Sequence, residues 1–327
     1  MNANLLDVRN LSVSFHTDGG VFKAVDDVSL HVNRGEIVGL VGESGCGKSV
    51  TSLSILRLIP SPPGKIESGQ IYFKGHDLLK MDSDKLHQIR GKAISMIFQE
   101  PLSALSPLQR IGQQLVEAVR LHNDISKKEA WALAESWLEK VKIPDVKERM
   151  FAYPFQLSGG MQQRVMIAMA MMSEPDLIIA DEPTTALDVT IQAKIFALIK
   201  AMRLEKTSIL LITHDMGVIW EMCDRVVVMY ASRIAEEAGK DDIFIKPAHP
   251  YTQGLLNSIP KLTADSGRLE AIPGQVPSPF NYPSGCHFRD RCPHAFDQCL
   301  HEIPPLMNLG DSHRAACWIA DRLIHQE

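Results

Sequence analysis

The sequence predicts an α/β fold in which helices separate short buried strands, and three observations support this prediction. Short apolar runs recur along the first 230 or so residues, the segments between them have helical patterns, and the first run leads into a glycine-rich turn. Strands buried on both faces of a parallel sheet are continuous apolar runs of this kind. The predicted strands are Glu36–Gly42, Ala93–Phe98, Asp176–Asp181, Ser208–Thr213 and Arg225–Tyr230.

Composition places the chain among ordinary globular proteins. Of its 327 residues 45% are apolar and 22% are charged, and the net charge of −5 argues against a nonspecific nucleic-acid binder. The start, "MNANLLDVRNLSVSF", lacks the basic residues and apolar run of a signal peptide, and no stretch is long enough to cross a bilayer. We therefore expect a cytosolic protein that reaches any membrane through a partner, in a compartment where persistent disulfides are rare.

The character of the sequence changes twice along the chain. Between Arg110 and Met150 it becomes charged, amphipathic and helical, which predicts a helical insertion beside the sheet, within a helical subdomain of about residues 105–172. After about Lys240 proline becomes frequent, so that regular structure is expected to become sparse. The predicted division is a nucleotide-binding domain at 1–240 and a C-terminal extension at 241–327.

The turn after the first strand, "GESGCGKS", matches the phosphate-binding pattern G-x-x-x-x-G-K-[ST]. Its glycines allow backbone N–H groups to converge on phosphate oxygens at the positive end of the following helix. Lys48 places a charge on the β and γ phosphates, and the Ser49 hydroxyl suits Mg²⁺. A glycine-rich turn with a chance Lys-Ser is the alternative, and the strand-turn-helix context argues against it. The predicted cradle residues are Gly42, Glu43, Ser44, Gly45, Cys46, Gly47, Lys48, Ser49 and Val50.

A second strand, "LIIADEP", ends in two adjacent carboxylates. Asp181 at the strand end suits a Mg²⁺ contact, and Glu182 can polarise the water that attacks the γ-phosphate. A solvated acidic strand end is the structural alternative, but the phosphate-binding turn upstream favours the catalytic interpretation.

The stretch "QLSGGMQQR" supplies a second anion-binding turn at a helix start, with Ser158, Gly159 and Gly160 as donors. Here the sequence resembles the ATP-binding cassette (ABC) family, whose signature is LSGGQ, with Met161 in place of the usual glutamine. The resemblance implies a P-loop NTPase with a RecA-like core, an antiparallel β subdomain, a helical signature subdomain and a small irregular cysteine-rich extension.

The resemblance extends to four further positions. It implies that Gln99 in "IFQEP" contacts Mg²⁺ and links the ATP site to a transmembrane partner, and that Asp188 in "ALD" belongs to the loop that crosses between two ATPase subunits. His214 in "LITHD" matches the histidine that contacts the γ-phosphate, and Phe15 in "LSVSF" matches the aromatic residue that stacks on adenine. The implied catalytic residues are Glu182, His214, Gln99 and Lys48, and the implied Mg²⁺ contacts are Ser49, Gln99 and Asp181.

Longer stretches narrow the resemblance to the ATP-binding subunit of dipeptide/oligopeptide permeases: "FQEPLSALSP", "EPTTALDVTIQAKI", "HPYTQGLL" and the cysteine-rich tail. This resemblance implies an ATPase on the cytoplasmic face of the membrane that drives peptide import. The implied partners are a second, related ATPase subunit, two integral membrane subunits and an extracytoplasmic binding protein. The helical block Arg110–Met150 is expected to offer the docking groove, and an ordinary amphipathic helical cap is the alternative.

Other functions remain open at this point. The same machinery in close relatives imports nickel, glutathione, oligosaccharides or antimicrobial peptides. A soluble cassette protein of DNA repair or translation is a rival, although such proteins usually have two cassettes or a long coiled-coil insertion, which this chain lacks. A metal-sensing or redox regulator is a second rival.

Four cysteines, Cys286, Cys292, Cys299 and Cys317, are spaced by five, six and seventeen residues. Structural zinc favours a tight C-x₂₋₄-C pair and ferredoxins have other spacings, so neither pattern matches. The permease resemblance implies a [4Fe–4S] cluster on these four residues. Zinc remains the second hypothesis, with His287, His294 and His313 as substitute ligands, and buried reduced cysteines or disulfides remain open. Cys46 and Cys223 are predicted to be packing positions, although Cys46 near a helix start could have a lowered pKa.

Overall fold

The structure is a computed structural model that describes residues 4–184, 187–204, 207–259, 272–310 and 312–325. The chain forms two compact units. Unit 1 comprises Met1–Leu5, Val32–Ile37 and Lys80–Ile212, and unit 2 comprises Leu6–His31, Val38–Leu79 and Thr213–Glu327. Among the described residues no helix is both long and apolar enough to span a membrane.

Unit 1 contains a parallel part of the sheet and a group of helices. Strands β6 (Ile94–Ile97), β7 (Leu177–Asp181) and β8 (Ser208–Ile212) are parallel neighbours in that order, and every residue in them is buried. This burial on both faces explains the unbroken apolar runs in the sequence. The carboxyl ends of β7 and β8 lie side by side, because Asp181 is in register with Ile212.

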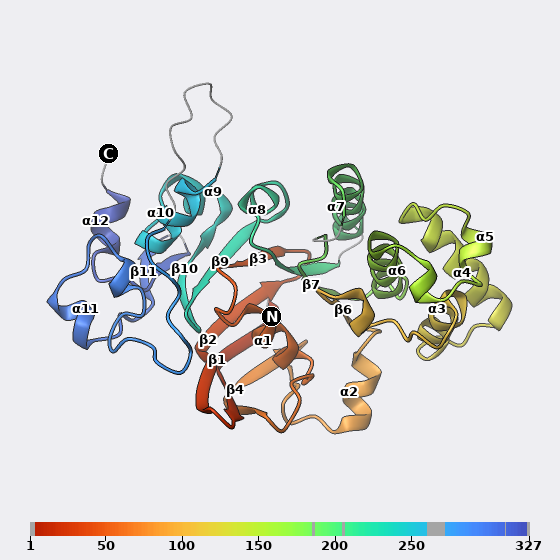
Figure 1. The fold of residues 1–327 in the computed structure, drawn as a ribbon, viewed down its shortest axis with the longest axis horizontal. Coiled ribbons are helices and arrows are strands. Elements are labelled where there is room, and N and C mark those ends of the chain that lie inside the picture. Colours follow the sequence, from red (N-terminus) through yellow and green to blue (C-terminus); the bar gives the residue numbers. More distant parts are fainter. Residues whose placement is uncertain (1–3, 185–186, 205–206, 260–271, 311, 326–327) are drawn as a thin grey trace. The chain divides into compact units, whose positions relative to one another are not determined.

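The helical block of unit 1 confirms the predicted insertion. Helices α3, α4, α5 and α6 lie together beside β6 and β7 (Figure 1). At the start of α4 the Ser126 hydroxyl accepts from the Glu129 N–H at 3.2 Å, while the Glu129 carboxylate accepts from the Ser126 N–H at 2.9 Å. The helices of this unit are α2 (Ser83–Ile89), η1 (Pro101–Ser103), α3 (Ile111–Arg120), α4 (Lys127–Lys140), α5 (Val146–Arg149), η2 (Pro154–Gln156), α6 (Gly159–Met171) and α7 (Val189–Leu204).

An antiparallel sheet in unit 2 has the strand order β2-β1-β4-β5. These strands are β1 (Asn4–Thr17), β2 (Gly20–Asn33), β4 (Gly64–Phe73) and β5 (His76–Asp77). In β2, Val28, Leu30 and Val32 are buried and alternate with more exposed residues, as expected for a strand with one covered face. The antiparallel subdomain expected from the family resemblance is therefore present.

Unit 2 also contains the strand that leads into the phosphate-binding turn. Strand β3 (Ile37–Val41) pairs in parallel with β9 (Arg225–Tyr230), and β9 pairs antiparallel with β10 (Arg233–Gly239). Around these strands lie α1 (Lys48–Ile55), α8 (Met216–Met222), α9 (Lys240–Ile245) and α10 (Pro250–Asn257).

The C-terminal extension is more regular than its proline content predicts. Strands β11 (Met307–Gly310) and β12 (His313–Ala315) continue the sheet beyond β10, and all three pair antiparallel (Figure 1). The remainder is largely irregular, with the short helices η3 (Arg289–Arg291), α11 (Asp297–His301) and α12 (Ala320–Ile324). These short strands form because β12 pairs with β10 and β11 pairs with β12, so that both extend an existing sheet.

Candidate nucleotide-binding site

The turn between β3 and α1 has the shape that a phosphate-binding loop requires. Gly47 caps α1 with φ of 106°, and a Cβ there would lie 2.3 Å from the Ala24 carbonyl oxygen. Gly42 has φ of 150°, and a Cβ there would lie 2.1 Å from the Met229 carbonyl oxygen. Both the left-handed backbone and the contact with neighbouring main chain exclude a side chain at these two positions. The predicted strand-turn-helix context is thus present in unit 2.

The Lys48 ammonium is buried at this loop. Its Nζ donates to the carbonyl oxygens of Gly42 at 2.7 Å and Glu43 at 3.0 Å. Cys46 is fully buried, and burial raises the pKa of its thiol although Lys48 nearby lowers it. The lowered pKa expected from the helix start was wrong, because burial outweighs the local positive potential. Cys46 and Cys223 are both buried packing residues, as predicted.

Two residues of the C-terminal extension contact the phosphate-binding loop, and the sequence did not identify them. The Tyr251 hydroxyl accepts from the Glu43 N–H at 2.8 Å, and the Arg291 guanidinium binds the Glu43 carboxylate with both terminal nitrogens. Tyr251 lies in the "HPYTQGLL" stretch and Arg291 immediately precedes Cys292. Both stretches stood out in the sequence, but nothing in them indicates the loop as their partner.

Phe15, the predicted adenine-stacking residue, lies on β1 and is half-buried. Its ring stacks on Phe22 with centroids 5.6 Å apart and planes 14° apart. Phe280 of the extension packs edge-on against Phe22, with ring centroids 4.8 Å apart. The predicted ring is therefore part of an aromatic cluster in unit 2.

In unit 1 the structure brings Gln99 and Glu182 together. The Gln99 side-chain amide donates to Glu182 Oε2 at 3.3 Å, so that a residue two positions after β6 contacts the residue directly after β7. Asp181, the last residue of β7, is buried. Glu182 adopts a left-handed φ of 47°, and its N–H donates to the Ile212 carbonyl at 2.9 Å. The two carboxylates thus leave the strand in different directions, one buried and one half-buried.

The second anion-binding turn begins α6. The Ser158 hydroxyl accepts from the Met161 N–H at 3.4 Å, and Ser158 and Gly159 are exposed. The two glutamines after Met161 bind main chain within unit 1. Gln162 donates to the Pro154 carbonyl at 2.8 Å, and the buried Gln163 donates to the Glu182 carbonyl at 3.4 Å. Gln163 therefore connects α6 to the main chain of Glu182, a role that the sequence did not reveal.

The two remaining predicted residues lie at helix starts. Asp188 accepts from the Ile191 N–H at 3.0 Å at the beginning of α7, whereas Ala186 of the same motif lies outside the described residues. His214 is exposed and follows β8, in unit 2, directly before Asp215, whose carboxylate caps α8.

The four cysteines of the extension line one small enclosed cavity of about 20 Å³. Burial, together with the neighbouring thiols, raises the pKa of Cys286 to about 11 and that of Cys317 to about 12. All six cysteines are free thiols. No three of the His, Cys, Asp and Glu side chains in the described ranges form a group that could hold a single metal ion.

Of the three histidines expected as substitute zinc ligands, only His294 lines this cavity. His313 instead binds the buried Glu236 carboxylate at 2.7 Å, and His287 Nδ1 lies 2.8 Å from the Ala231 carbonyl oxygen. The structure therefore does not support His287 and His313 as ligands.

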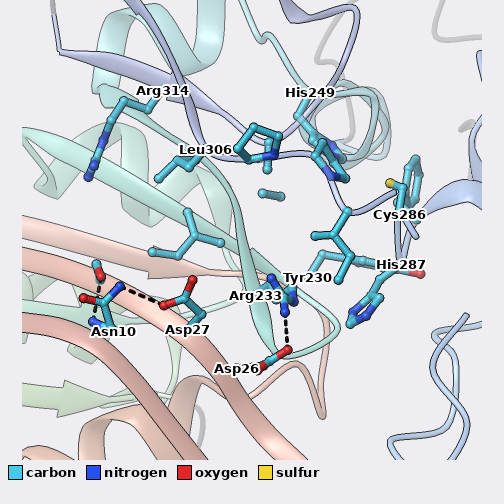
Figure 2. Close-up of a pocket in the computed structure, with 18 residues that line it drawn as sticks. Asn10, Asp26, Asp27, Tyr230, Arg233, His249, Cys286, His287, Leu306 and Arg314 are labelled. Carbon is cyan, nitrogen blue, oxygen red and sulfur yellow. Dashed lines mark hydrogen bonds and ion pairs between the residues drawn. The ribbon is translucent and has the colours of Figure 1, made fainter. Parts of the chain in front are cut away.

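A separate cavity of about 470 Å³ lies in unit 2 between the first strands, β10 and the extension (Figure 2). Its polar wall contains an ion pair between Arg233 and Asp26 and a hydrogen bond that Asn10 donates to Asp27. Of the predicted metal ligands, Cys286 and the substitute ligand His287 line it. This cavity is thus distinct from the phosphate-binding loop.

Comparison with known proteins gives consistent matches. Residues 25–185 match the family model described as ABC transporter, and residues 235–299 match the model of the oligopeptide/dipeptide transporter C-terminal region. The chain is 49% identical to the dipeptide transport ATP-binding protein DppD of Bacillus subtilis, over 97% of this chain and 95% of that protein. It is 47% identical to the oligopeptide transport ATP-binding protein AppD of the same organism, over 97% of each chain.

Solved structures resemble the larger part of the chain. A dimeric ATP-binding cassette bound to ADP and phosphate in a post-hydrolysis state has a TM-score of 0.66 and 27% identity, over 72% of this chain and 98% of that chain. A dimeric bacterial ABC transporter cassette matches over the same shares, with a TM-score of 0.65 and 28% identity.

Proposed function

Since the chain belongs to the ABC transporter ATP-binding proteins, we propose that it is the ATP-hydrolysing subunit of an importer that takes up dipeptides and oligopeptides. The observation that carries this proposal is the similarity of nearly the whole chain, extension included, to peptide-transport ATP-binding proteins. Both the cassette, residues 25–185, and the C-terminal region, residues 235–299, match their family models.

Each predicted site residue has its own task in hydrolysis. The loop Gly42–Val50 binds the phosphates through backbone N–H groups, Lys48 neutralises their charge and Phe15 stacks on the adenine. Glu182 orients and deprotonates the attacking water, and Gln99 holds that carboxylate by donating to it at 3.3 Å. His214 and Lys48 stabilise the charge that develops on the γ-phosphate.

The side chains expected at the magnesium ion suit that metal. Ser49, Asp181 and Gln99 offer hydroxyl, carboxylate and amide oxygens, which are the ligands that Mg²⁺ prefers. Because Gln99 uses its NH₂ group toward Glu182, its amide oxygen remains the metal-binding atom. When bound there, Mg²⁺ would supply charge neutralisation for the phosphates.

We place the exposed turn Ser158–Gly160 against the nucleotide of a second ATPase subunit. Ser158 and Gly159 are exposed, and the turn begins the 13-residue helix α6, whose N-terminal dipole favours an anion. Asp188 lies in the loop that faces the same partner. The dimeric arrangement of the similar solved cassettes supports this assignment.

The helical block is the proposed docking surface for the two integral membrane subunits. Residues of α3 and α4 line a groove of about 570 Å³ that combines apolar Val116, Leu121 and Trp131 with charged Glu117 and Arg120. Leu108, Phe151 and Phe155 are also largely exposed in this block. A groove and exposed apolar side chains in the same block of helices are typical of a protein contact surface. Docking there places the chain peripherally on the cytoplasmic face, with an extracytoplasmic binding protein delivering the cargo.

For the four-cysteine cavity we propose a [4Fe–4S] cluster held by Cys286, Cys292, Cys299 and Cys317. All four thiols line one enclosed cavity, and a cluster of four irons holds its sulfur ligands farther apart than a single ion does. The described residues form no group around a metal ion, so the proposal rests on the cavity that the four thiols share. A cluster would cross-link an irregular segment and make its state sensitive to oxidation.

Co-purification tests the proposed function. The tagged chain, expressed with the neighbouring transport genes, is expected to be recovered with two integral membrane proteins and a second ATPase, and the complex should hydrolyse ATP. Recovery of a free chain bound to nucleic acid would contradict the proposal. Uptake assays with labelled dipeptide, nickel, glutathione and oligosaccharide separate peptide import from other cargo.

Anaerobic preparation should give a brown, iron-containing protein, and a colourless, iron-free one would exclude the cluster.

A further inference from the structure

The C-terminal extension does more than follow the ATPase domain in the sequence, because it contacts the phosphate-binding loop directly. We infer that Arg291 and Tyr251 are positioning residues of the ATP site, which fix the start of the phosphate-binding loop through Glu43. The inference rests on the proposed assignment of Gly42–Ser49 as the phosphate cradle. In the sequence Tyr251 lies 208 positions after Glu43, and Arg291 lies 248 positions after it.

The contact between Arg291 and Glu43 is a two-pronged ion pair. Arg291 Nη1 lies 2.6 Å from Glu43 Oε2, and Nη2 lies 3.1 Å from Oε1. The Arg291 side chain is 5% exposed and that of Glu43 is 31% exposed. Paired parallel hydrogen bonds of this kind fix geometry as well as charge, which a lysine ammonium cannot reproduce.

Arg291 is itself held firmly by the extension. Its Nε donates to the Pro273 carbonyl at 2.9 Å, and its guanidinium lies 5.7 Å from the ring centroid of Tyr230 and 5.9 Å from that of Phe288. A side chain with this many partners has little freedom to move. It therefore transmits the position of the extension to Glu43.

Tyr251 holds the main chain of the same loop residue. Its side chain is fully buried, and its hydroxyl accepts from the Glu43 N–H at 2.8 Å. Its own N–H donates to His249 Nδ1 at 3.0 Å at the start of α10. Glu43 is thus fixed through its N–H by Tyr251 and through its carboxylate by Arg291.

Lys48, the predicted catalytic lysine, also contacts Glu43. Lys48 Nζ donates to the carbonyl oxygen of Glu43 at 3.0 Å and to that of Gly42 at 2.7 Å. Releasing Glu43 would therefore move two acceptors that seat the Lys48 ammonium. We expect nucleotide affinity to fall for ATP and ADP alike, because both phosphate chains use this cradle.

The same turn offers a matched control. Arg289 stands two residues before Arg291 in η3, but its guanidinium binds the Ser284 and Leu300 carbonyl oxygens, inside the extension. Replacing Arg289 by methionine removes a guanidinium and local hydrogen bonds without touching the loop. It therefore reports the effect of a weakened extension alone.

The test compares full-length Arg291→Met, Arg289→Met and Tyr251→Phe chains by calorimetric titration with ATP and ADP and by hydrogen exchange of the loop amides. Arg291→Met should raise both dissociation constants by about tenfold or more and speed exchange across Gly42–Ser49. Tyr251→Phe, which keeps the ring, should raise them by about threefold to tenfold. Arg289→Met should leave both measurements near wild type.

Equal effects of the Arg291 and Arg289 variants, or unchanged loop exchange in Arg291→Met and Tyr251→Phe, would overturn the inference. A merely structural role would lower the folded fraction and leave the affinity of the remaining sites unchanged. Arg291→Lys should recover only part of the affinity, whereas full recovery would contradict the two-pronged geometry.

Lys48→Ala separates the two proposals. If Lys48→Ala abolishes binding while Arg291→Met leaves both dissociation constants at the wild-type values, the positioning role fails. If Lys48→Ala leaves binding intact, the cradle assignment itself fails.

Discussion

His249 makes the extension sensitive to acid, because its neutral ring caps the helix that carries Tyr251. Its Nδ1 accepts from the Tyr251 N–H at 3.0 Å, and burial lowers its pKa to about 4. The buried Glu236 carboxylate faces it and raises the pKa, as does a hydrogen bond with the Ala316 main chain, but burial outweighs both. We therefore compare the free energy of unfolding of wild type and His249→Asn as the pH is lowered from 7 to 4.

The sign and size of the effect follow from the two pKa values. The folded pKa of about 4 lies below the ordinary value of 6.5, so that between these values the unfolded chain binds a proton that the folded chain excludes. The stabilisation from a neutral His249 is present above pH 6.5 and is lost as the pH falls toward 4. At about 1.4 kcal/mol per pH unit, this amounts to about 3 kcal/mol of the free energy of unfolding.

The assay is urea unfolding of the full chain at several pH values. Asparagine at position 249 still offers a capping oxygen but does not titrate, so that His249→Asn should depend less steeply on pH between 6.5 and 4, by about 1.4 kcal/mol per pH unit. Carboxylates elsewhere titrate in both proteins, so their effect cancels in the difference. Parallel pH profiles of the two proteins would refute the burial argument.

Three further outcomes are expected. Glu182→Gln should lower ATP turnover of the assembled complex by about a hundredfold or more while nucleotide binding persists, and undiminished turnover would remove Glu182 from the catalytic role. Gly47→Ala should abolish calorimetrically measured ATP binding, because its Cβ would lie 2.3 Å from the Ala24 carbonyl oxygen, and retained affinity would contradict the close approach. Cys299→Ser should reduce the iron content of anaerobically purified protein, whereas the same change at the buried Cys223 should not; equal loss would argue against the four-cysteine site.

The buried strands and the phosphate-binding turn were predictable because each has a local signature. An apolar run such as Leu177–Asp181 is buried on both faces, and glycines at 42 and 47 leave no room for side chains. The Gln99–Glu182 contact agrees with both residues following neighbouring parallel strands.

The hold of the extension on the loop was not predictable, because its signal is not local. Arg291 and Glu43 are 248 positions apart, and a single charge in either segment is consistent with an ordinary solvated side chain. Strands β11 and β12 were missed for a related reason. Runs of four and three residues are too short to show a periodicity, and they form because β12 pairs with β10 and β11 pairs with β12. The raised pKa of Cys46 likewise depends on burial by distant residues.

ATP-dependent uptake of a labelled dipeptide into vesicles tests the central claim most directly. The vesicles contain the complete complex and the binding protein, with either the wild-type chain or Glu182→Gln. We predict uptake that requires ATP, is competed by unlabelled oligopeptide and falls to background with Glu182→Gln. Uptake that continues with the variant, or that is specific for a cargo without peptide bonds, would contradict the account.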